Sequence, residues 1–331
     1  MNILKKGSRS AALSATVTEI DSEDAGQRID NFLTRVLKGV PKSHIYQLLR
    51  TGQVRVNSRR TAPTYRLQAA DRVRLPPVRT AAPAATRPSG PRAAAEPRLS
   101  GRALFEDNAL LIIDKPAGVA AHGGSGISSG VIERLRAELP EVRFLELVHR
   151  LDRDTSGVLL LAKKRSALTN LHSQIRDGEV GKWYLTLVHG RWTNAKQHVR
   201  LSLNKFITAA GERRVSVNPE GLPSHTVFKL VRNLGDYSLL QAELKTGRTH
   251  QIRVHLAHLG FPIAGDDKYG DFALNKTLQR EGLKRMFLHA QRVVFRHPLT
   301  NATMTVEAGL PTELQAFIDR HAKIPEVTSI E

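Results

Sequence analysis

The chain has 331 residues, with 50 Lys and Arg against 31 Asp and Glu, which gives a formal net charge of +19 and a pI near 10.6. Such a surface attracts polyanions, and nucleic acid is favoured over an anionic membrane because no basic amphipathic helix carries a dense apolar face. The absence of cysteine excludes disulfides, thiolate zinc sites and cysteine nucleophiles, and no apolar run resembles a signal peptide or a membrane-spanning helix.

The N-terminal part of the chain gains pattern gradually. Residues 1–26 are expected to form a loose arm with at most one strand, over 15–20. Apolar residues then recur at helical spacing over 29–37, which predicts an amphipathic helix. Gly39 and Pro41 are expected to end it, because glycine suits a helix C-terminus and proline cannot continue the helix.

A second short helix and two strands are predicted next. Ser43 is expected to cap the helix at its N-terminus, and Gly52 to close it. Alternating apolar residues predict strands over 54–56 and 73–75, with a turn over 57–60 after the first of them.

This module, residues 27–77, holds eleven Lys or Arg against two Asp. Two short helices and a small basic sheet resemble the S4 RNA-binding domain, and Arg28–Asp30 and Gln53–Asn57 carry that resemblance. The alternative is a small basic domain with a solvated face, but a basic domain this compact favours RNA binding. The predicted RNA-binding residues here are Arg28, Lys42, Arg50, Arg55, Arg59 and Arg60.

A segment rich in alanine and proline follows, with seven Ala and four Pro over residues 78–100. Such a composition buries too little apolar surface to fold, so we expect a flexible linker that lets the basic module move relative to the body. The body is expected to span 101–325, with a tail over 326–331.

The body mixes strand-like and helical patterns. The strand-like runs are Leu110–Ile113, Leu145–Val148, Val158–Ala162, Trp183–Val188, Thr226–Val231, Leu239–Lys245 and Arg292–Phe295. The helical patterns are Val131–Leu139, Ala167–Ile175, His250–Leu259 and Glu313–Arg320. Several strands follow one another through short turns, which predicts the α+β class with a largely antiparallel sheet.

One charged turn, His149–Gly157, leads directly into the apolar run 158–162. It places Asp152 between Arg150 and Arg153. A nearby opposite charge keeps an aspartate ionised, so Asp152 is a candidate nucleophile or base. The turn by itself is also compatible with a solvated surface.

Two other interpretations of this turn are weaker. A kinase catalytic loop does not fit, because Leu151 is inserted and no glycine-rich phosphate loop precedes it. A glycosidase pair of Asp152 and Asp154 is disfavoured, because both would be tied to local arginines and neither has the environment of a proton donor.

Two further segments concentrate unusual residues. Residues 182–190 form a strand with an aromatic pair that includes Tyr184, although such a tyrosine is more often packing than a reactive phenol. In residues 244–255 a strand ends in a glycine turn that starts a helix, with Thr249 as its expected N-cap. That helix end can hold an anion, and Arg248 in the turn can pair with a carboxylate in bidentate fashion.

The remaining polar clusters carry less information. The histidines after Thr249 lack the spacing of a zinc site, and adjacent Asp266 and Asp267 point in divergent directions, so we expect no metal. Lys163, in a run of three charges, is predicted to lie on a solvated face or to contact phosphate. We count it among the RNA-binding residues.

Together these segments resemble the RluA-type pseudouridine synthases. Four motifs occur in the family's order, over 107–118, 149–157, 182–184 and 246–255. The resemblance covers about residues 102–310. With the S4-like module ahead of it, the chain is most similar to the RluC subgroup, which acts on large-subunit (23S) ribosomal RNA.

The resemblance implies a pseudouridine synthase fold and the isomerisation of uridine to pseudouridine in ribosomal RNA. It implies no cofactor and no metal, and we expect a cytoplasmic monomer. Asp152 would be the catalytic aspartate, Arg248 its ion-pair partner, and Tyr184 the residue that stacks on the base and assists removal of the C5 proton. Arg150, as an RNA-binding residue, would enter the space left by the flipped nucleotide. A non-catalytic S4-type RNA-binding or ribosome-assembly protein, and a different RNA glycosidic-bond enzyme, remain as alternatives.

Overall fold

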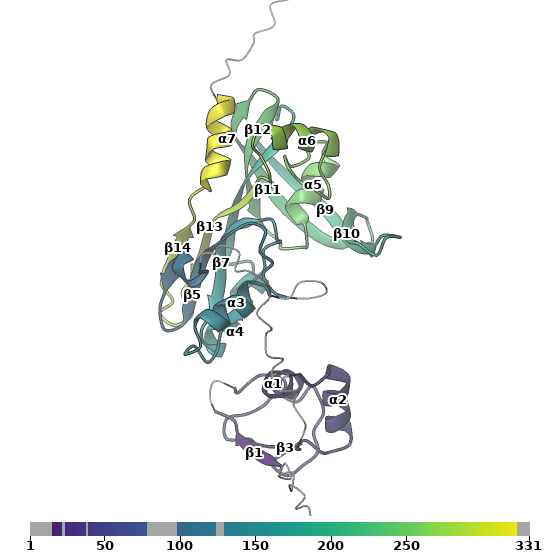
Figure 1. Cartoon of the computed structure of the whole chain (residues 1–331), viewed down its shortest axis with the longest axis vertical. Coiled ribbons are helices and arrows are strands. Elements are labelled where there is room, and N and C mark those ends of the chain that lie inside the picture. Colours follow the sequence, from purple (N-terminus) through teal and green to yellow (C-terminus); the bar gives the residue numbers. More distant parts are fainter. Residues whose placement is uncertain (1–14, 22–23, 38, 78–97, 124–128, 323–331) are drawn as a thin grey trace, which may run out of the picture. The chain divides into compact units, whose positions relative to one another are not determined.

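The computed structural model describes residues 15–21, 24–37, 39–77, 98–123 and 129–322 (Figure 1). Contacts divide the chain into two compact units, Met1–Glu96 and Pro97–Glu331. The expected linker over 78–100 lies outside the described residues except for its last three positions, and the expected tail lies outside them entirely.

The N-terminal unit contains two helices and a three-stranded sheet in the order β1-β3-β2, with antiparallel pairs. Its elements are β1 (Thr16–Glu19), α1 (Ile29–Val36), α2 (Lys42–Arg50), β2 (Arg55–Val56) and β3 (Arg72–Leu75). The apolar face of each helix packs into one core, to which Phe32 and Leu48 belong. Each predicted element is present, within a few residues of its expected bounds.

The start of α2 corrects one detail. Ser43 lies inside the helix, and the N-cap is Pro41, with φ −58° and ψ 143°. The Pro41 carbonyl already accepts hydrogen bonds from the amides of His44 and Ile45, at 3.0 and 3.1 Å. The prediction that Ser43 caps this helix was therefore wrong, because proline's fixed φ suits the entry into a helix.

The second unit is built on a sheet of eleven strands with the main order β10-β9-β11-β12-β8-β13-β7-β5-β4. We call it the catalytic unit because the catalytic residues predicted from the sequence fall within it. The strands are β4 (Ala103–Glu106), β5 (Leu110–Lys115), β6 (Glu146–Leu147), β7 (Ser156–Ala162), β8 (Gly181–His189), β9 (Lys196–Ile207), β10 (Arg213–Val217), β11 (Leu222–Leu234), β12 (Tyr237–Leu244), β13 (Leu288–Arg296) and β14 (Thr303–Glu307). In the described part of the chain, β13 and β7 are the only strand pair that runs parallel. The predicted α+β class with a largely antiparallel sheet is confirmed.

Helices cover parts of this sheet (Figure 1). They are α3 (Val131–Glu138), α4 (Arg165–Arg176), α5 (Gln251–His258), α6 (Phe272–Arg280) and α7 (Thr312–Ala322), with a short 3-10 turn η1 (Ser100–Arg102) before β4. Separate apolar clusters pack around β7, and all its residues are buried. This double burial explains why β7 reads as a continuous apolar run.

Four strands and one helix of the catalytic unit were not predicted: β4, β9, β10, β14 and α6. They carry many exposed residues. The β9–β10 hairpin projects beyond the rest of the unit (Figure 1). Elements with so many exposed residues bury little surface, so their apolar residues show no clear period.

Gly157 stands where β7 meets β13. It has φ +108°, and a Cβ there would lie 2.2 Å from the carbonyl oxygen of Ala290, the residue with which it pairs. We expect Gly157→Ala to lower the free energy of unfolding by about 3 kcal/mol or more, because both backbones would have to separate. Chemical denaturation measures the change. Gly101→Ala, with open space around that position, is the control, and equal stability of the two variants would contradict this account.

Candidate active site

A cavity of about 940 Å³ in the catalytic unit brings together the three segments singled out in the sequence. The predicted residues that line it are Arg150, Asp152, Tyr184 and Arg248. Their elements are far apart along the chain, so only the folded sheet creates this site. Lys163 is not among the lining residues; its ammonium pairs with the Glu106 carboxylate at 2.6 Å.

The loop between β6 and β7 that carries Asp152 is held by its backbone. The Asp152 carbonyl accepts a hydrogen bond from the Thr155 amide at 3.2 Å, and the Arg153 carbonyl accepts one from the Gly118 amide at 2.9 Å. The side chain of Leu151 is buried in the core beneath the loop. These contacts fix the direction in which the Asp152 carboxylate points.

Lys115 adds a further anchor to the loop. It is fully buried, and its ammonium donates to the carbonyl oxygens of Pro116, Val119 and Arg153 at 2.8, 2.7 and 3.0 Å. Burial lowers the pKa of Lys115 to about 7. All three ammonium protons have backbone acceptors, so this lysine holds the loop rather than a ligand.

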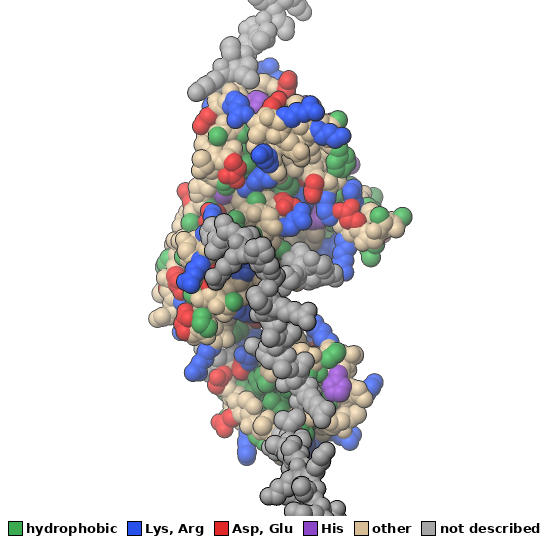
Figure 2. Space-filling view, in the orientation of Figure 1, with side chains coloured by type: hydrophobic (Ala, Val, Ile, Leu, Met, Phe, Trp, Pro, Cys, Tyr) green, Lys and Arg blue, Asp and Glu red, His purple; other side chains and the backbone are tan. Residues whose placement is uncertain are grey.

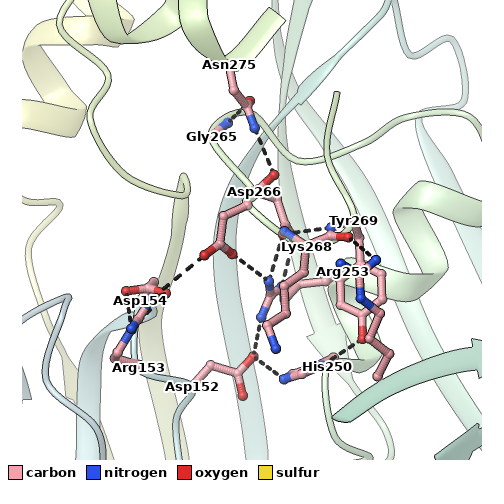
Figure 3. A network of polar contacts seen from close by, with 12 residues as sticks. Asp152, Arg153, Asp154, His250, Arg253, Gly265, Asp266, Lys268, Tyr269 and Asn275 are labelled. Atoms are coloured by element: carbon pink, nitrogen blue, oxygen red, sulfur yellow. Dashed lines mark hydrogen bonds and ion pairs between the residues drawn. The ribbon is translucent and has the colours of Figure 1, made fainter. Parts of the chain in front are cut away.

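The Asp152 carboxylate is paired with Arg253 of α5 (Figure 3). Arg253 Nη1 lies 3.2 Å from Asp152 Oδ2, while Nε and Nη2 each donate to Asp266 at 2.7 Å. Burial acts to lower the pKa of Arg253, but Asp266 and Asp152 raise it overall. The side chains of Arg253 and Asp266 are only 4% and 1% exposed, against 30% for Asp152. A fixed guanidinium thus joins a buried carboxylate to one that faces the cavity.

The prediction that Arg248 pairs with Asp152 was wrong for this structure. Arg248 Nε donates instead to the carbonyl oxygen of Pro223 at 3.1 Å, although the residue still lines the cavity. Between the two arginines His250 adopts a left-handed conformation with φ 54° and is the N-cap of α5. The chain turns there, so that Arg253, within the helix, points inward.

The expected cap of α5, Thr249, is likewise corrected. Instead of a threonine side chain, Gln251 organises this turn: its side-chain oxygen accepts hydrogen bonds from the Arg248 amide at 2.9 Å and the Thr246 hydroxyl at 2.8 Å. The Gln251 side chain therefore folds back over the turn that precedes the helix, and the N-cap residue, His250, makes no side-chain capping bond. The sequence did hold one signal for Arg253: a charged residue stands between two apolar ones, Ile252 and Val254. In the structure this helix is buried from Gln251 to Leu256.

Tyr184 lines the cavity from β8 and is 7% exposed. Burial, with the charge of Asp152 adding to it, raises the pKa of the Tyr184 phenol above its usual range. The phenol is therefore neutral at pH 7. Its hydroxyl makes no hydrogen bond to any residue that the structure describes, which leaves it available to a ligand.

His250 completes the surroundings of Asp152 (Figure 3). Its Nε2 lies 3.8 Å from Asp152 Oδ2, and its Nδ1 lies 2.8 Å from the Tyr269 hydroxyl. Burial lowers the pKa of His250, against the opposing effect of Asp152. The ring is expected to be neutral at pH 7, and Arg253 then supplies the positive charge next to Asp152.

Positive charge dominates the cavity lining. Asp152 is the one carboxylate among the lining residues. The lining cations are Arg150, Arg153, Arg176, Lys182, Arg248 and Arg253. Lys and Arg side chains are also spread over the visible surface of each unit (Figure 2). A polyanion is the ligand such a cavity favours, with Asp152 placed to react with it.

The basic residues predicted to bind RNA in the N-terminal unit differ in whether their side chains already bond to other residues of the protein. Arg28 is committed to Asp30, with Nη2 2.6 Å from Oδ2, and Asp30 also accepts from the Tyr46 hydroxyl at 2.8 Å. Arg55 Nε donates to the Gly52 carbonyl at 3.1 Å. Of the six predicted residues, five are exposed: Lys42, Arg50, Arg55, Arg59 and Arg60. Their contacts with RNA stay a prediction.

Comparison with known proteins finds a matching family for each of the two units. The family described as RNA pseudouridylate synthase matches residues 109–258, and the S4 domain matches residues 27–73. Two curated relatives named ribosomal large subunit pseudouridine synthase C are 51% identical over 94% of this chain and 98% of the protein from Salmonella typhimurium, and 50% identical over 93% of this chain and 97% of the protein from Escherichia coli.

Solved structures show the same fold at lower identity. Human RNA pseudouridylate synthase domain containing 4 matches with a TM-score of 0.55 and 22% identity, over 68% of this chain and 94% of that one. Human RNA pseudouridylate synthase domain containing 1 matches with a TM-score of 0.53 and 24% identity, over 64% and 85%. In the part of the chain that the structure describes, no helix has the length and apolar character to cross a membrane.

Proposed function

Because the chain belongs to the RNA pseudouridylate synthase family, as its relatives of about 50% identity show, we propose that it isomerises uridines of large-subunit ribosomal RNA to pseudouridine. The predicted resemblance to that family is confirmed. The observation that supports the activity most directly is Asp152, a single carboxylate in a cationic cavity, held by the buried Arg253. We further propose that the protein works as a cytoplasmic monomer without a cofactor.

In the proposed reaction the target uridine leaves the RNA stack and enters the cavity. An uncharged pyrimidine inside folded RNA has to be flipped before its glycosidic bond is accessible. The N1–C1′ bond breaks, the uracil turns, and a C5–C1′ bond forms. The C5 proton leaves to solvent and N1 gains a proton, so no water is consumed and no electrons are transferred.

Three side chains are proposed to act on the nucleotide. Asp152 is the nucleophile or base that starts the reaction, and Arg253 holds its carboxylate in place. Tyr184 contacts the base through its ring, and its neutral hydroxyl is open to a polar group of the substrate. Arg150, exposed at the rim of the cavity, fills the space that the flipped nucleotide leaves.

The N-terminal unit is proposed to anchor the RNA. We expect a variant without residues 1–85 to bind ribosomal RNA more weakly, and with a shallower dependence of affinity on salt, because it loses exposed cations that displace counterions. Affinity measured from 50 to 200 mM salt gives the slope. The catalytic unit should keep its circular dichroism spectrum, since the two units have separate cores. An unchanged slope would contradict the anchoring role.

Release of tritium from RNA labelled at uridine C5, together with mass analysis, tests the activity. A synthase releases the label without changing the mass of the RNA once proton exchange is accounted for. A non-catalytic S4-type RNA-binding protein would release nothing, and a glycosidic-bond hydrolase would leave an abasic site and free uracil. Mapping pseudouridines in large-subunit ribosomal RNA from a strain that lacks this protein identifies the target uridines.

A further inference from the structure

Lys182, at the start of β8, stands out among the cations of the cavity. It lines the cavity, yet it forms no hydrogen bond or ion pair with any residue that the structure describes. Asp152 is not its ion-pair partner, because that carboxylate pairs with Arg253. A half-buried ammonium without a partner is unfavourable, since it loses hydration and gains nothing in return. This burial lowers the pKa of Lys182.

Lys115 shows, by contrast, that this fold provides hydrogen-bond acceptors for the ammonium of a lysine with a structural role. The three protons of Lys115 go to three carbonyl oxygens within 3.0 Å. Lys182 instead extends toward the turn before α5, where its Nζ lies 3.7 Å from the position a Cβ would take on Gly247. The absence of a side chain at residue 247 leaves space beside the ammonium.

The neighbours of Lys182 within the cavity make its ligand an anion. Burial, and then the charge of Lys182, lower the pKa of His149 to about 4, and its Nε2 accepts a hydrogen bond from the Leu160 amide at 3.3 Å. A neutral ring committed to the backbone cannot neutralise an ammonium. In RNA the groups with a formal negative charge are the phosphates, and lysine binds phosphate as a compact point charge.

Strand geometry relates Lys182 to the base. Residues two apart on a strand project from the same face, so Lys182 and Tyr184 point into one cavity. Trp183, between them, lies on the other face, where the Arg292 guanidinium stacks over its ring at 4.3 Å. We propose that Lys182 binds a backbone phosphate adjoining the flipped uridine and so positions that nucleotide between Tyr184 and Asp152. This inference rests on the proposed function.

The first test measures affinity and its salt dependence. The probe is a large-subunit ribosomal RNA fragment that contains a uridine mapped as above, bound to the full-length protein. We expect Lys182→Gln to weaken binding about 10-fold or more, and to reduce the slope of log K against log salt by about 0.7 to 0.9. Lys182→Arg should keep the slope. Lys276→Gln, an exposed position of α6 outside the cavity, is the matched control and should change neither quantity.

The second test changes the RNA. A single uncharged methylphosphonate replaces the phosphate on the 5′ side or on the 3′ side of the target uridine, with a 2′-O-methyl group on the adjoining ribose to prevent cleavage. A fragment with the same 2′-O-methyl ribose and an ordinary phosphate serves as control. At one of these two positions the wild-type protein should lose affinity and slope, and Lys182→Gln should lose nothing more. This measurement on the wild-type protein decides the question even if Lys182→Gln does not fold.

Two outcomes would overturn the inference. Wild-type binding that is indifferent to both methylphosphonates would exclude a phosphate contact, and weaker binding by Lys182→Gln with an unchanged slope would indicate an uncharged partner such as a uracil carbonyl. Both can occur in an enzyme that still forms pseudouridine. A wild-type protein that binds the fragment but leaves its uridine unchanged would instead contradict the proposed function.

Discussion

Asp152→Asn is expected to abolish pseudouridine formation, lowering the rate by about 10⁴-fold or more, while RNA affinity and folding persist. The amide has the shape of the carboxylate and can still accept a hydrogen bond from Arg253, but it cannot act as nucleophile or base. The buried Arg253 keeps its ion pair with Asp266, so the substitution leaves no buried charge unpaired. Tritium release from C5-labelled RNA, with filter binding alongside, separates the two effects.

Asp154→Asn is the matched control for that experiment. Asp154 lies in the same loop, but it pairs with the exposed Arg153 at 3.1 Å and does not line the cavity. We expect this variant to retain most of the activity. If Asp152→Asn converts uridine at a rate comparable with that of Asp154→Asn, Asp152 is not the catalytic carboxylate.

Arg253→Gln is expected to reduce both activity and stability. It removes the charge that fixes Asp152 and leaves Asp266, 1% exposed, without its ion-pair partner. Breaking a buried pair in this way costs about 3 to 5 kcal/mol, and we expect the rate to fall by about 100-fold or more through loss of positioning. Urea denaturation measures the first effect, and single-turnover kinetics, under conditions where the variant is folded, measure the second.

Arg248→Gln is the comparison that distinguishes the two arginines. The Arg248 side chain is exposed and, among the residues that the structure describes, bonds only to a backbone carbonyl, so its loss should leave the free energy of unfolding within about 0.5 kcal/mol of the wild type. Its effect on the rate should be much smaller than that of Arg253→Gln. If Arg248→Gln destroys activity and Arg253→Gln does not, the pairing predicted from the sequence would be right for the reacting enzyme.

The elements that could be predicted from the sequence are those that bury one face or are buried on both faces. Ile29–Val36 shows a clean helical period, and Ser156–Ala162 is apolar almost throughout, because each buries its apolar residues in one core or between two. The hairpin over β9 and β10 was not predicted because most of its residues are exposed or half-buried, so hydrophobic burial leaves little trace in their order.

The sequence predicted which segments form the site, but not which arginine pairs with Asp152. The charged turn and the aromatic strand were found from composition, and the fold brings them to one cavity. Arg248 and Arg253 belong to a single motif, and which of them faces Asp152 depends on the left-handed turn at His250. Asp266 was discounted as a metal ligand because adjacent carboxylates point in divergent directions. Its pairing with Arg253 was not predicted, because no local pattern shows that a carboxylate 13 residues away will meet that arginine inside the protein.

The parallel pairing of β7 with β13 has a consequence for the order in which this protein matures. His289 of β13 pairs with Ser156 of β7 across 133 residues of chain. Strand β7, which follows the loop that carries Asp152, can therefore pair with β13 only when nearly the whole catalytic unit has been synthesised. The N-terminal unit has its own core, and N-terminal domains generally fold first during synthesis. Given the proposed anchoring role of this unit, a nascent chain acquires its affinity for RNA before its reaction centre forms, and catalysis is the last property to appear.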